Sequence, residues 1–265
     1  MSAAVPLVIQ VSDTHLRRGD EAADLAFATA AGWIARRRPD LVVHTGDIVG
    51  GAVDEEADHA HAAALLRALP CPVRCIPGNH DVGDGPPRPP SVTAERVARF
   101  EAFYGPAQWH TLLDGWTLVG ADAMRCETGL DEALVWEEVA LAALAPRAIL
   151  FLHKAPFLLD PAADGTATRA TLPAASRLRL AEELSGFRGI VACGHRHEFR
   201  LFHRGGATVV WAPAVAPLLA EANPPAAPLP AFPGLIEYDL RGETAIIRHV
   251  PLDAARIAIA ADQRA

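Results

Sequence analysis

Residues 5–15 read VPLVIQVSDTH, an apolar run that gives way to polar residues at Ser12. A short, almost continuously apolar run is typical of a β-strand buried on both faces, as in parallel sheets. Asp13 and His15 then stand directly at the end of this strand. A buried strand that ends in polar residues recurs along the chain, and this repetition predicts an α/β architecture.

Helices are expected between these strands because the apolar residues there follow a 3.6-residue period. The expected strands of the first part are 5–11, 40–45 and 73–76, with helices over 21–37, 54–69 and 93–104. Those of the middle part are 117–121, 148–152 and 189–193, with helices over 131–144 and 174–184. Each strand from the first part ends in polar residues, and so do two of the middle part.

The last part of the chain has another pattern. Glycine-containing turns at 204–206 and 241–243 separate short strand-like runs, which indicates antiparallel pairing. The runs are 199–203, 207–211, 234–240 and 244–250. Residues 83–90 and 212–233 are rich in proline and aperiodic, so we expect loops there, the second one near a pocket mouth.

Composition limits the classes of function. The chain has 265 residues, 51% of them hydrophobic, but no apolar run of the roughly 18 residues that span a bilayer. With no export signal at its start, we expect a cytoplasmic protein, no membrane partner and four reduced cysteines. A net charge of −8 argues against nucleic acid as the partner, because a phosphate backbone is held by surplus Lys and Arg.

Residues of metal-ligand type stand at the carboxyl ends of five expected strands. These ends lie along one edge of a parallel sheet, so residues far apart in the chain can converge there. The residues are Asp13, His15, Asp47, Asn79, His80, His153, His195 and His197. Taken alone, a histidine is often structural, Asp13 suits a helix N-cap, and Gly78-Asn79 suits a turn. Recurrence at five strand ends predicts a cluster instead.

The residue types of this cluster suit a pair of metal ions. Carboxylates, an amide and imidazoles without thiolate fit Mn²⁺, Fe²⁺ or Zn²⁺. Even with His80 left aside, seven donors exceed the needs of one ion, whereas two ions about 3.5–4 Å apart, sharing a carboxylate and a water, use them all. The shared water would be a hydroxide nucleophile near neutral pH, and the ions would hold an anionic phosphoester in an acidic protein. Six other histidines are expected to be structural or solvated: His44, His59, His61, His110, His203 and His249.

Five blocks of the sequence resemble the signature blocks of the calcineurin-like metallophosphoesterases. They are Asp13-x-His15, Gly46-Asp47, Gly78-Asn79-His80-Asp81, His153 and Gly194-His195-x-His197. The resemblance implies a single such domain over residues 1–265, a four-layer αββα sandwich with a dinuclear metal site at the carboxyl ends of the strands. The motif-bearing part covers about 5–197, and the late antiparallel strands and Pro-rich loop cover 198–250.

The resemblance also implies a role for each site residue. Asp13, His15, Asp47 and His197 would hold the first ion, and Asp47, Asn79, His153 and His195 the second. Asp47 would bridge the two ions. His80 matches the non-ligand histidine of the family that contacts the phosphoryl oxygen and protonates the leaving alkoxide, and Asp81 is expected to orient it.

Departures from the family pattern point to one branch. In protein Ser/Thr phosphatases the aspartate that matches Asp47 is followed by Asp-Arg-Gly, whereas here Ile48-Val49-Gly50 follows. Purple acid phosphatases have a tyrosine ligand at the position of Gly50. His80 replaces the arginine of the UDP-diacylglucosamine hydrolases. The first and third blocks are most similar to bacterial class III cyclic nucleotide phosphodiesterases and glycerophosphodiesterases. Those proteins commonly have a second histidine where this chain has Lys154.

The resulting expectation is hydrolysis of a small phosphodiester, of the cyclic nucleotide or glycerophosphodiester type, with a homodimer as the candidate assembly. A phosphomonoesterase or a nuclease at the same metal site is the alternative, followed by a non-catalytic binding protein of the same fold. Charges at the mouth would come from side chains expected at the surface, namely Arg17, Arg88, Arg125, Lys154 and Arg196.

Overall fold

The computed structural model describes residues 5–85, 88–159, 170–216 and 233–252. The strands in these ranges are β1 Leu7–Val11, β2 Leu41–His44, β3 Val73–Cys75, β4 Trp109–Leu113, β5 Trp116–Gly120, β6 Ala148–Leu152, β7 Ile190–Cys193, β8 Arg200–Arg204, β9 Ala207–Trp211, β10 Gly234–Arg241 and β11 Thr244–Pro251. They form a five-stranded sheet in the order β11-β10-β1-β2-β3 and a six-stranded sheet in the order β4-β5-β6-β7-β9-β8.

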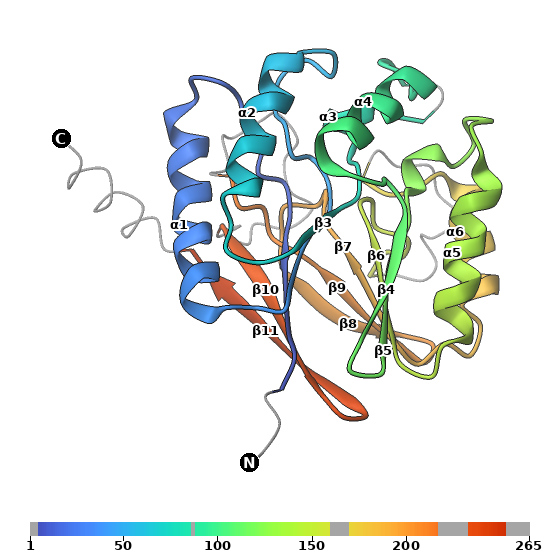
Figure 1. Ribbon diagram of the computed structural model, residues 1–265. Helices are drawn as coiled ribbons and strands as arrows, with labels where there is room; N and C mark the ends of the chain where they lie inside the picture. Colours follow the sequence, from blue (N-terminus) through green and yellow to red (C-terminus); the bar gives the residue numbers. More distant parts are fainter. Residues whose placement is uncertain (1–4, 86–87, 160–169, 217–232, 253–265) are drawn as a thin grey trace.

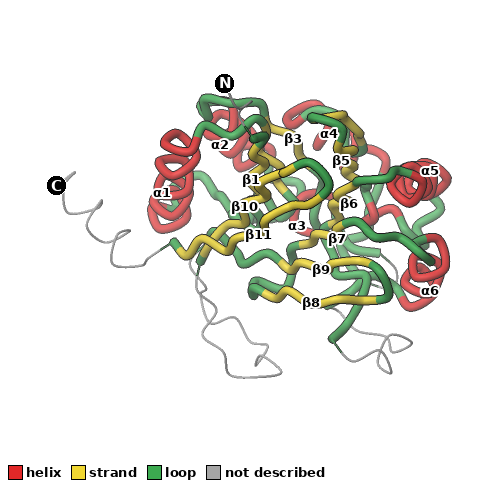
Figure 2. The backbone as a smooth tube through the Cα atoms, turned by 90° about the horizontal axis from the view of Figure 1, so that it is seen from below, coloured by secondary structure: helices red, strands yellow, loops and turns green. Residues whose placement is uncertain are grey.

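Helices cover the outer faces of both sheets, which confirms the α/β fold with two sheets between helical layers (Figures 1 and 2). They are α1 Glu21–Arg37, α2 Glu56–Arg67, α3 Asn79–Val82, α4 Ala94–Tyr104, the short 3₁₀ helix η1 Ala123–Arg125, α5 Glu132–Leu144 and α6 Ala174–Glu183. In Figure 2, α1 and α2 lie on one side of the sheets and α5 and α6 on the other. Among the described helices, none combines the length and apolar character of a bilayer span.

The alternation of side chains in β1 shows how the layers are filled. Leu7, Ile9 and Val11 point to the helical side and pack in a core with α1 and α2. Val8 points the other way, into the core shared by the two sheets. Successive strand residues face opposite sides of a sheet, so a strand that is apolar at four of its five positions, as β1 is, is suited to the inside of this sandwich.

The topology brings the carboxyl ends of the central strands to the same edge. β1, β2 and β3 run parallel to one another in the first sheet, as do β5, β6, β7 and β9 in the second. α3 follows β3 directly and lies at the upper edge in Figure 1. The residues that follow β1, β2, β3, β6 and β7 are those predicted to carry the site.

The late strands pair antiparallel, as predicted, and they join both sheets. β8 pairs with β9, and β10 pairs with β11 and with β1, where Leu7 lies opposite Asp239. β4 was not predicted, and a short helix, α3, stands where only a turn was expected. Residues 86–87 and 217–232, in the two predicted loops, lie outside the described residues.

Candidate metal centre

Seven predicted ligand residues converge at the edge where the parallel strands end. Asp13, His15, Asp47 and His197 form one group, and Asp47, His153 and His195 form a second. Within each group, one ligand atom per residue lies within 4.8 Å of all the others. Asn79 joins the second group, because its Oδ1 is 3.2 Å from His153 Nε2. Asp47 belongs to both groups, which is the arrangement that two ions with a shared carboxylate require.

The backbone at the candidate ligands adopts an uncommon conformation. Five of them have positive φ angles although they are not glycine: Asp13 (52°), His15 (45°), Asp47 (51°), His195 (63°) and His197 (55°). The left-handed region is unfavourable for side chains with a Cβ, and residues held there concentrate at functional sites. The sharp turns after β1, β2 and β7 thus aim these side chains at one point.

Two glycines of the motifs are required by close packing around the carboxylates. A Cβ at Gly78 would overlap the backbone nitrogen and Oδ1 of Asp47. A Cβ at Gly194 would overlap Ser12 Oγ and would lie 2.7 Å from Asp13 Oδ2. These glycines therefore let the ends of β3 and β7 approach the ends of β2 and β1.

The first group is built around the buried carboxylate of Asp13. Asp13 Oδ1 lies 3.2 Å from His197 Nε2, and the backbone N–H of His195 donates to Oδ2 over 3.0 Å. The Nε2 atoms of His15 and His197 face each other at 3.1 Å. Two imidazole nitrogens at this distance need a proton or a cation between them.

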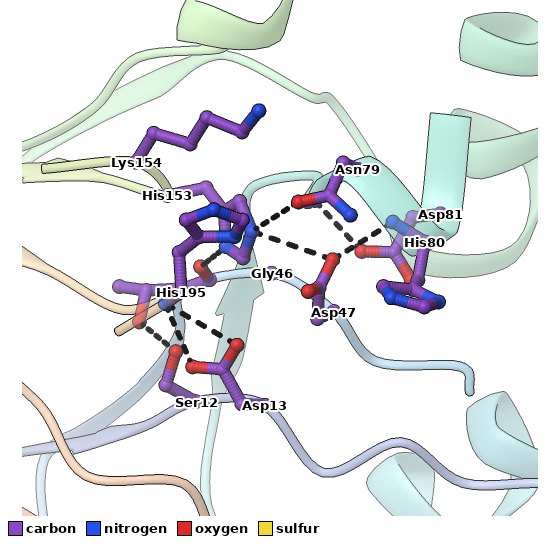
Figure 3. A network of polar contacts seen from close by, with 12 residues as sticks. Ser12, Asp13, Gly46, Asp47, Asn79, His80, Asp81, His153, Lys154 and His195 are labelled. Atoms are coloured by element: carbon purple, nitrogen blue, oxygen red, sulfur yellow. Dashed lines mark hydrogen bonds and ion pairs between the residues drawn. The ribbon is translucent and has the colours of Figure 1, made fainter. Parts of the chain in front are cut away.

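The second group surrounds the buried ring of His153 (Figure 3). His153 Nδ1 donates to the carbonyl oxygen of Thr45 over 2.8 Å, which directs Nε2 toward Asp47 Oδ1 at 3.3 Å and Asn79. A backbone acceptor on one ring nitrogen is a common way to orient a histidine ligand and leave the other nitrogen for a metal.

Electrostatics favour positive charge in the centre. Burial alone would raise the pKa of the Asp47 carboxyl, but His153, and then His80 and His15, hold it well below its usual range. Burial alone would lower the pKa of His153, but the Asp47 carboxylate raises it to about 9. Two buried carboxylates facing imidazoles in a donor set without thiolate fit a pair of divalent cations.

His80, the predicted acid, lies beside the cluster without entering either ligand group. Its backbone N–H donates to Asp47 Oδ1 over 2.8 Å. Its ring is half-buried and meets the ring of His15 edge-on, with the centroids 4.9 Å apart. His80 is therefore held next to the candidate metal positions with part of its ring open to solvent.

Asp81 makes other contacts than the predicted one to the His80 ring. Its fully buried carboxylate accepts the backbone N–H groups of Gly78, Ile48 and Val49 over 2.8, 2.9 and 3.1 Å. Burial, with the neighbouring Asp47, raises the pKa of Asp81 to about 7. These contacts fasten the turn after β2 to the turn after β3, so Asp81 orders the backbone of the site.

A buried polar chain under the site was missed by the sequence reasoning. Tyr238 Oη donates to Gln10 Oε1 over 2.7 Å, Gln10 Nε2 to Thr45 Oγ1 over 3.0 Å, and Thr45 Oγ1 to Ser12 Oγ over 2.8 Å. Gln10 Nε2 also lies 3.4 Å from the carbonyl oxygen of Cys193 in the other sheet. The one available signal was a glutamine inside an otherwise apolar strand.

Two of the five charges expected at the surface are buried. Arg125 is 8% exposed, and its Nε donates to Asp122 Oδ2 over 2.8 Å. Lys154 is 2% exposed and pairs with Asp84. Arg17 is exposed, while Arg88 and Arg196 are partly buried.

The remaining histidines lie outside both ligand groups of the described residues. Burial lowers the pKa of His44 to about 3, and its neutral ring contacts Thr14 Oγ1 at 2.9 Å. The helix N-cap considered for Asp13 is made by Asp20, whose carboxylate accepts the Ala23 N–H of α1. Asp13 is thus free to face the cluster.

The chain matches a known family in sequence and several solved structures in fold. A family model described as calcineurin-like phosphoesterase matches residues 6–199. Among curated proteins, none matches the sequence significantly.

Several solved structures share the fold at low sequence identity. A dimetal phosphatase from Danio rerio has a TM-score of 0.65 and 14% identity, over 94% of this chain and 97% of that chain. A purple acid phosphatase from yellow lupin (Lupinus luteus) has a TM-score of 0.69 and 12% identity, over 95% of this chain and 52% of that chain. GAP50, the anchor in the inner membrane complex of Plasmodium, has a TM-score of 0.62 and 10% identity, over 95% of this chain and 86% of that chain.

Proposed function

This chain belongs to the calcineurin-like phosphoesterase family, and from that membership we propose that it hydrolyses a small phosphodiester with two divalent cations. The observation that carries the proposal is the pair of ligand groups that share Asp47, each with its donor atoms within 4.8 Å of one another. A lone structural metal would not need a second group of donors beside the first. Dinuclear sites with a shared carboxylate are typical of phosphoester hydrolysis.

We assign the ligands by group. The first ion would be held by Asp13, His15, Asp47 and His197, and the second by Asp47, Asn79, His153 and His195. When bound, two divalent cations neutralise the phosphoryl oxygens and lower the pKa of the attacking water. The oxygen and nitrogen donors suit Mn²⁺, Fe²⁺ and Zn²⁺ alike.

His80 is our candidate for the acid that protonates the leaving oxygen. The hydrogen bond from its backbone N–H to Asp47 keeps His80 next to the ligand cluster. His80 is half-buried, so a substrate can approach its ring from the solvent side. Asp81 supports this role indirectly, because it holds the turn that carries His80 against the turn that carries Asp47. We expect His80 also to contact a phosphoryl oxygen of the bound substrate.

A small diester is favoured over the other phosphoesters. The first and third sequence blocks, around Asp13 and around Asn79, are similar to those of class III cyclic nucleotide phosphodiesterases and glycerophosphodiesterases. The net charge of −8 does not suit a long nucleic-acid strand, which is held by many Lys and Arg contacts. Monoesterase and nuclease activity remain the outcomes against which this preference is tested.

A substrate panel tests the proposal. Protein loaded with Mn²⁺ is offered bis-p-nitrophenyl phosphate, 3′,5′- and 2′,3′-cyclic nucleotides, glycerophosphodiesters, simple monoesters, plasmid and single-stranded DNA, and kcat/KM is compared. We expect the highest value for a small diester. A higher value for monoesters or DNA would overturn the diester assignment. Two bound ions without hydrolysis of any of these esters would indicate a binding protein instead.

A further inference from the structure

The ion pair between Lys154 and Asp84 is unusual in its burial. Lys154 follows His153 directly, and its Nζ lies 2.6 Å from Asp84 Oδ1. The side chains are 3% and 20% exposed. Removing an ammonium and a carboxylate from water is costly, and an apolar pair of similar volume is often at least as stable. Stability alone therefore does not explain this pair.

Asp84 is tightly connected to the residues of α3. α3 carries Asn79 and His80 and ends at Val82, and the N–H of the following Gly83 donates to the carbonyl oxygen of Asn79 over 3.0 Å. Asp84 comes next, and its backbone is fixed on both sides by hydrogen bonds with Pro90 (2.8 Å) and Val92 (3.2 Å). A contact that restrains the Asp84 carboxylate therefore also restrains Asn79, because only a short, hydrogen-bonded segment separates the two residues.

The pair also links the two sheets beside the second ligand group. α3 follows β3 of the first sheet, whereas Lys154 follows β6 of the second. In Figure 3, the Lys154 side chain leaves the backbone next to His153 and lies above the second group, on the side opposite Asp13. The segment with Asn79 and the segment with His153 are therefore joined twice, by the contact between these two side chains and by the ion pair of the residues that follow.

We propose that Lys154 and Asp84 are positioning residues, which hold Asn79 and His80 against His153 so that the second cation site is formed before the ion arrives. This inference rests on the proposed two-metal function. The pair acts through Asn79, so its loss should weaken the second ion more than the first. The first group has no residue on α3 or on the segment after β6.

Titration of the purified full chain with Mn²⁺ tests the inference. Binding is measured by calorimetry and by the Mn²⁺ EPR signal. Lys154→Met and Asp84→Asn should each lower the Mn²⁺ affinity of the second ligand group by about 10- to 100-fold, the usual effect of residues that orient ligands. The affinity of the first group should stay nearly unchanged. The exchanged pair, Lys154→Asp with Asp84→Lys, should restore part of the second affinity. If Lys154→Met does not fold, Asp84→Asn, which keeps the shape of Asp84, decides the question.

Arg37→Met is the matched control. Arg37 Nε lies 2.7 Å from Glu237, whose side chain is 3% exposed, in a pair between α1 and β10 outside both ligand groups. This variant should bind both ions as the wild type does. If Lys154→Met and Arg37→Met both lowered the affinity for both ions to the same extent, the effect would be one of general stability, and the inference would be overturned.

Steady-state kinetics separate positioning from direct contact with substrate. Positioning predicts a lower kcat in Lys154→Met with KM little changed at saturating Mn²⁺. An unchanged second affinity with a raised KM would instead make Lys154 a substrate contact and overturn the inference. Selective loss of the second ion in a protein that hydrolyses no phosphoester would support the inference while the proposed function fails.

Discussion

The two sheets bring different chemistry to the same site. The strand ends of the first sheet carry Asp13, His15, Asp47 and Asn79, and those of the second carry His153, His195 and His197. Negative charge and oxygen donors therefore come from the first sheet, whereas the second contributes imidazoles alone. Each ligand group takes residues from both sheets, so the packing of one sheet on the other is part of the site.

The interior between the sheets shows how that packing is ordered. Most of it is an apolar core, with Val8, Ile149 and Tyr238 among its members. Close to the site, the buried amide of Gln10 reaches the carbonyl oxygen of Cys193 across the interface. Apolar contacts are non-directional, whereas hydrogen bonds specify register. The polar chain thus adds one directional contact, from Gln10 to Cys193, between the two halves of the site.

Removal of the carboxylate common to both ligand groups should have the largest effect. Asp47→Ala is expected to lower kcat/KM for bis-p-nitrophenyl phosphate in Mn²⁺ by about 10³-fold or more, because charge stabilisation at both metal positions is lost. Asp54→Ala is the control, since Asp54 pairs with Arg96 and Arg99 at the surface. Near wild-type activity of folded Asp47→Ala protein would contradict the two-metal mechanism.

The loss of His80 should have the next largest effect, and it should depend on the leaving group. His80→Gln is expected to lower kcat by about 10²- to 10⁴-fold for alkyl esters, the usual contribution of a general acid. The loss should be smaller for p-nitrophenyl esters, whose leaving group needs no proton. Metal content measured by mass spectrometry should stay at the wild-type level. An equal loss for both ester types would remove His80 from the acid role.

The polar chain between the sheets should be worth less, and its effect is on stability. Gln10→Leu leaves the Tyr238 hydroxyl and Thr45 without their buried partner, so the free energy of unfolding in urea should fall by about 1–3 kcal/mol. Adding Tyr238→Phe removes one stranded group and should restore part of this loss. Strictly additive losses in the double variant would show that the two residues do not act as a chain.

The last prediction concerns the pH dependence of the stability of the metal-free protein. Burial lowers the pKa of His153, but the Asp47 carboxylate outweighs burial and raises this pKa from 6.5 to about 9. The folded state binds this proton more tightly than the unfolded state, so the stabilisation is complete below pH 6.5 and is lost as the pH rises through about 9. In EDTA, Tm should decline across this range, and His153→Gln should show less decline. An equal decline in both proteins would contradict the assignment.

The strand ends were predictable from sequence because they depend on local patterns. Apolar runs such as residues 7–11 and 148–152 identify buried strands, and parallel sheets bring their carboxyl ends together. The helix over 21–37 was predicted to the residue from its apolar period. The resemblance to the family blocks indicated which polar residues would share an ion. The pattern of strands and polar strand ends could not assign this by itself.

Contacts between distant segments were not predictable in the same way. β10 pairs with β1 more than 200 residues away, and nothing local in either strand names its partner. Lys154 was expected at the surface because lysine usually is, and only the tertiary position of Asp84 explains its burial. Asp81 was expected to orient His80, but its carboxylate accepts hydrogen bonds from backbone N–H groups of another turn, and nothing local in the sequence indicates those donors.

The proposed pair of ions sharing Asp47 is best tested by the amount of metal that the wild-type chain binds. The protein is stripped with chelator, reloaded with Mn²⁺, freed of excess ion and analysed by mass spectrometry, with anomalous scattering from crystals to locate each ion. We expect two ions per chain, both contacting Asp47. At most one ion in a fully reloaded sample, or two ions that do not share this carboxylate, would contradict it.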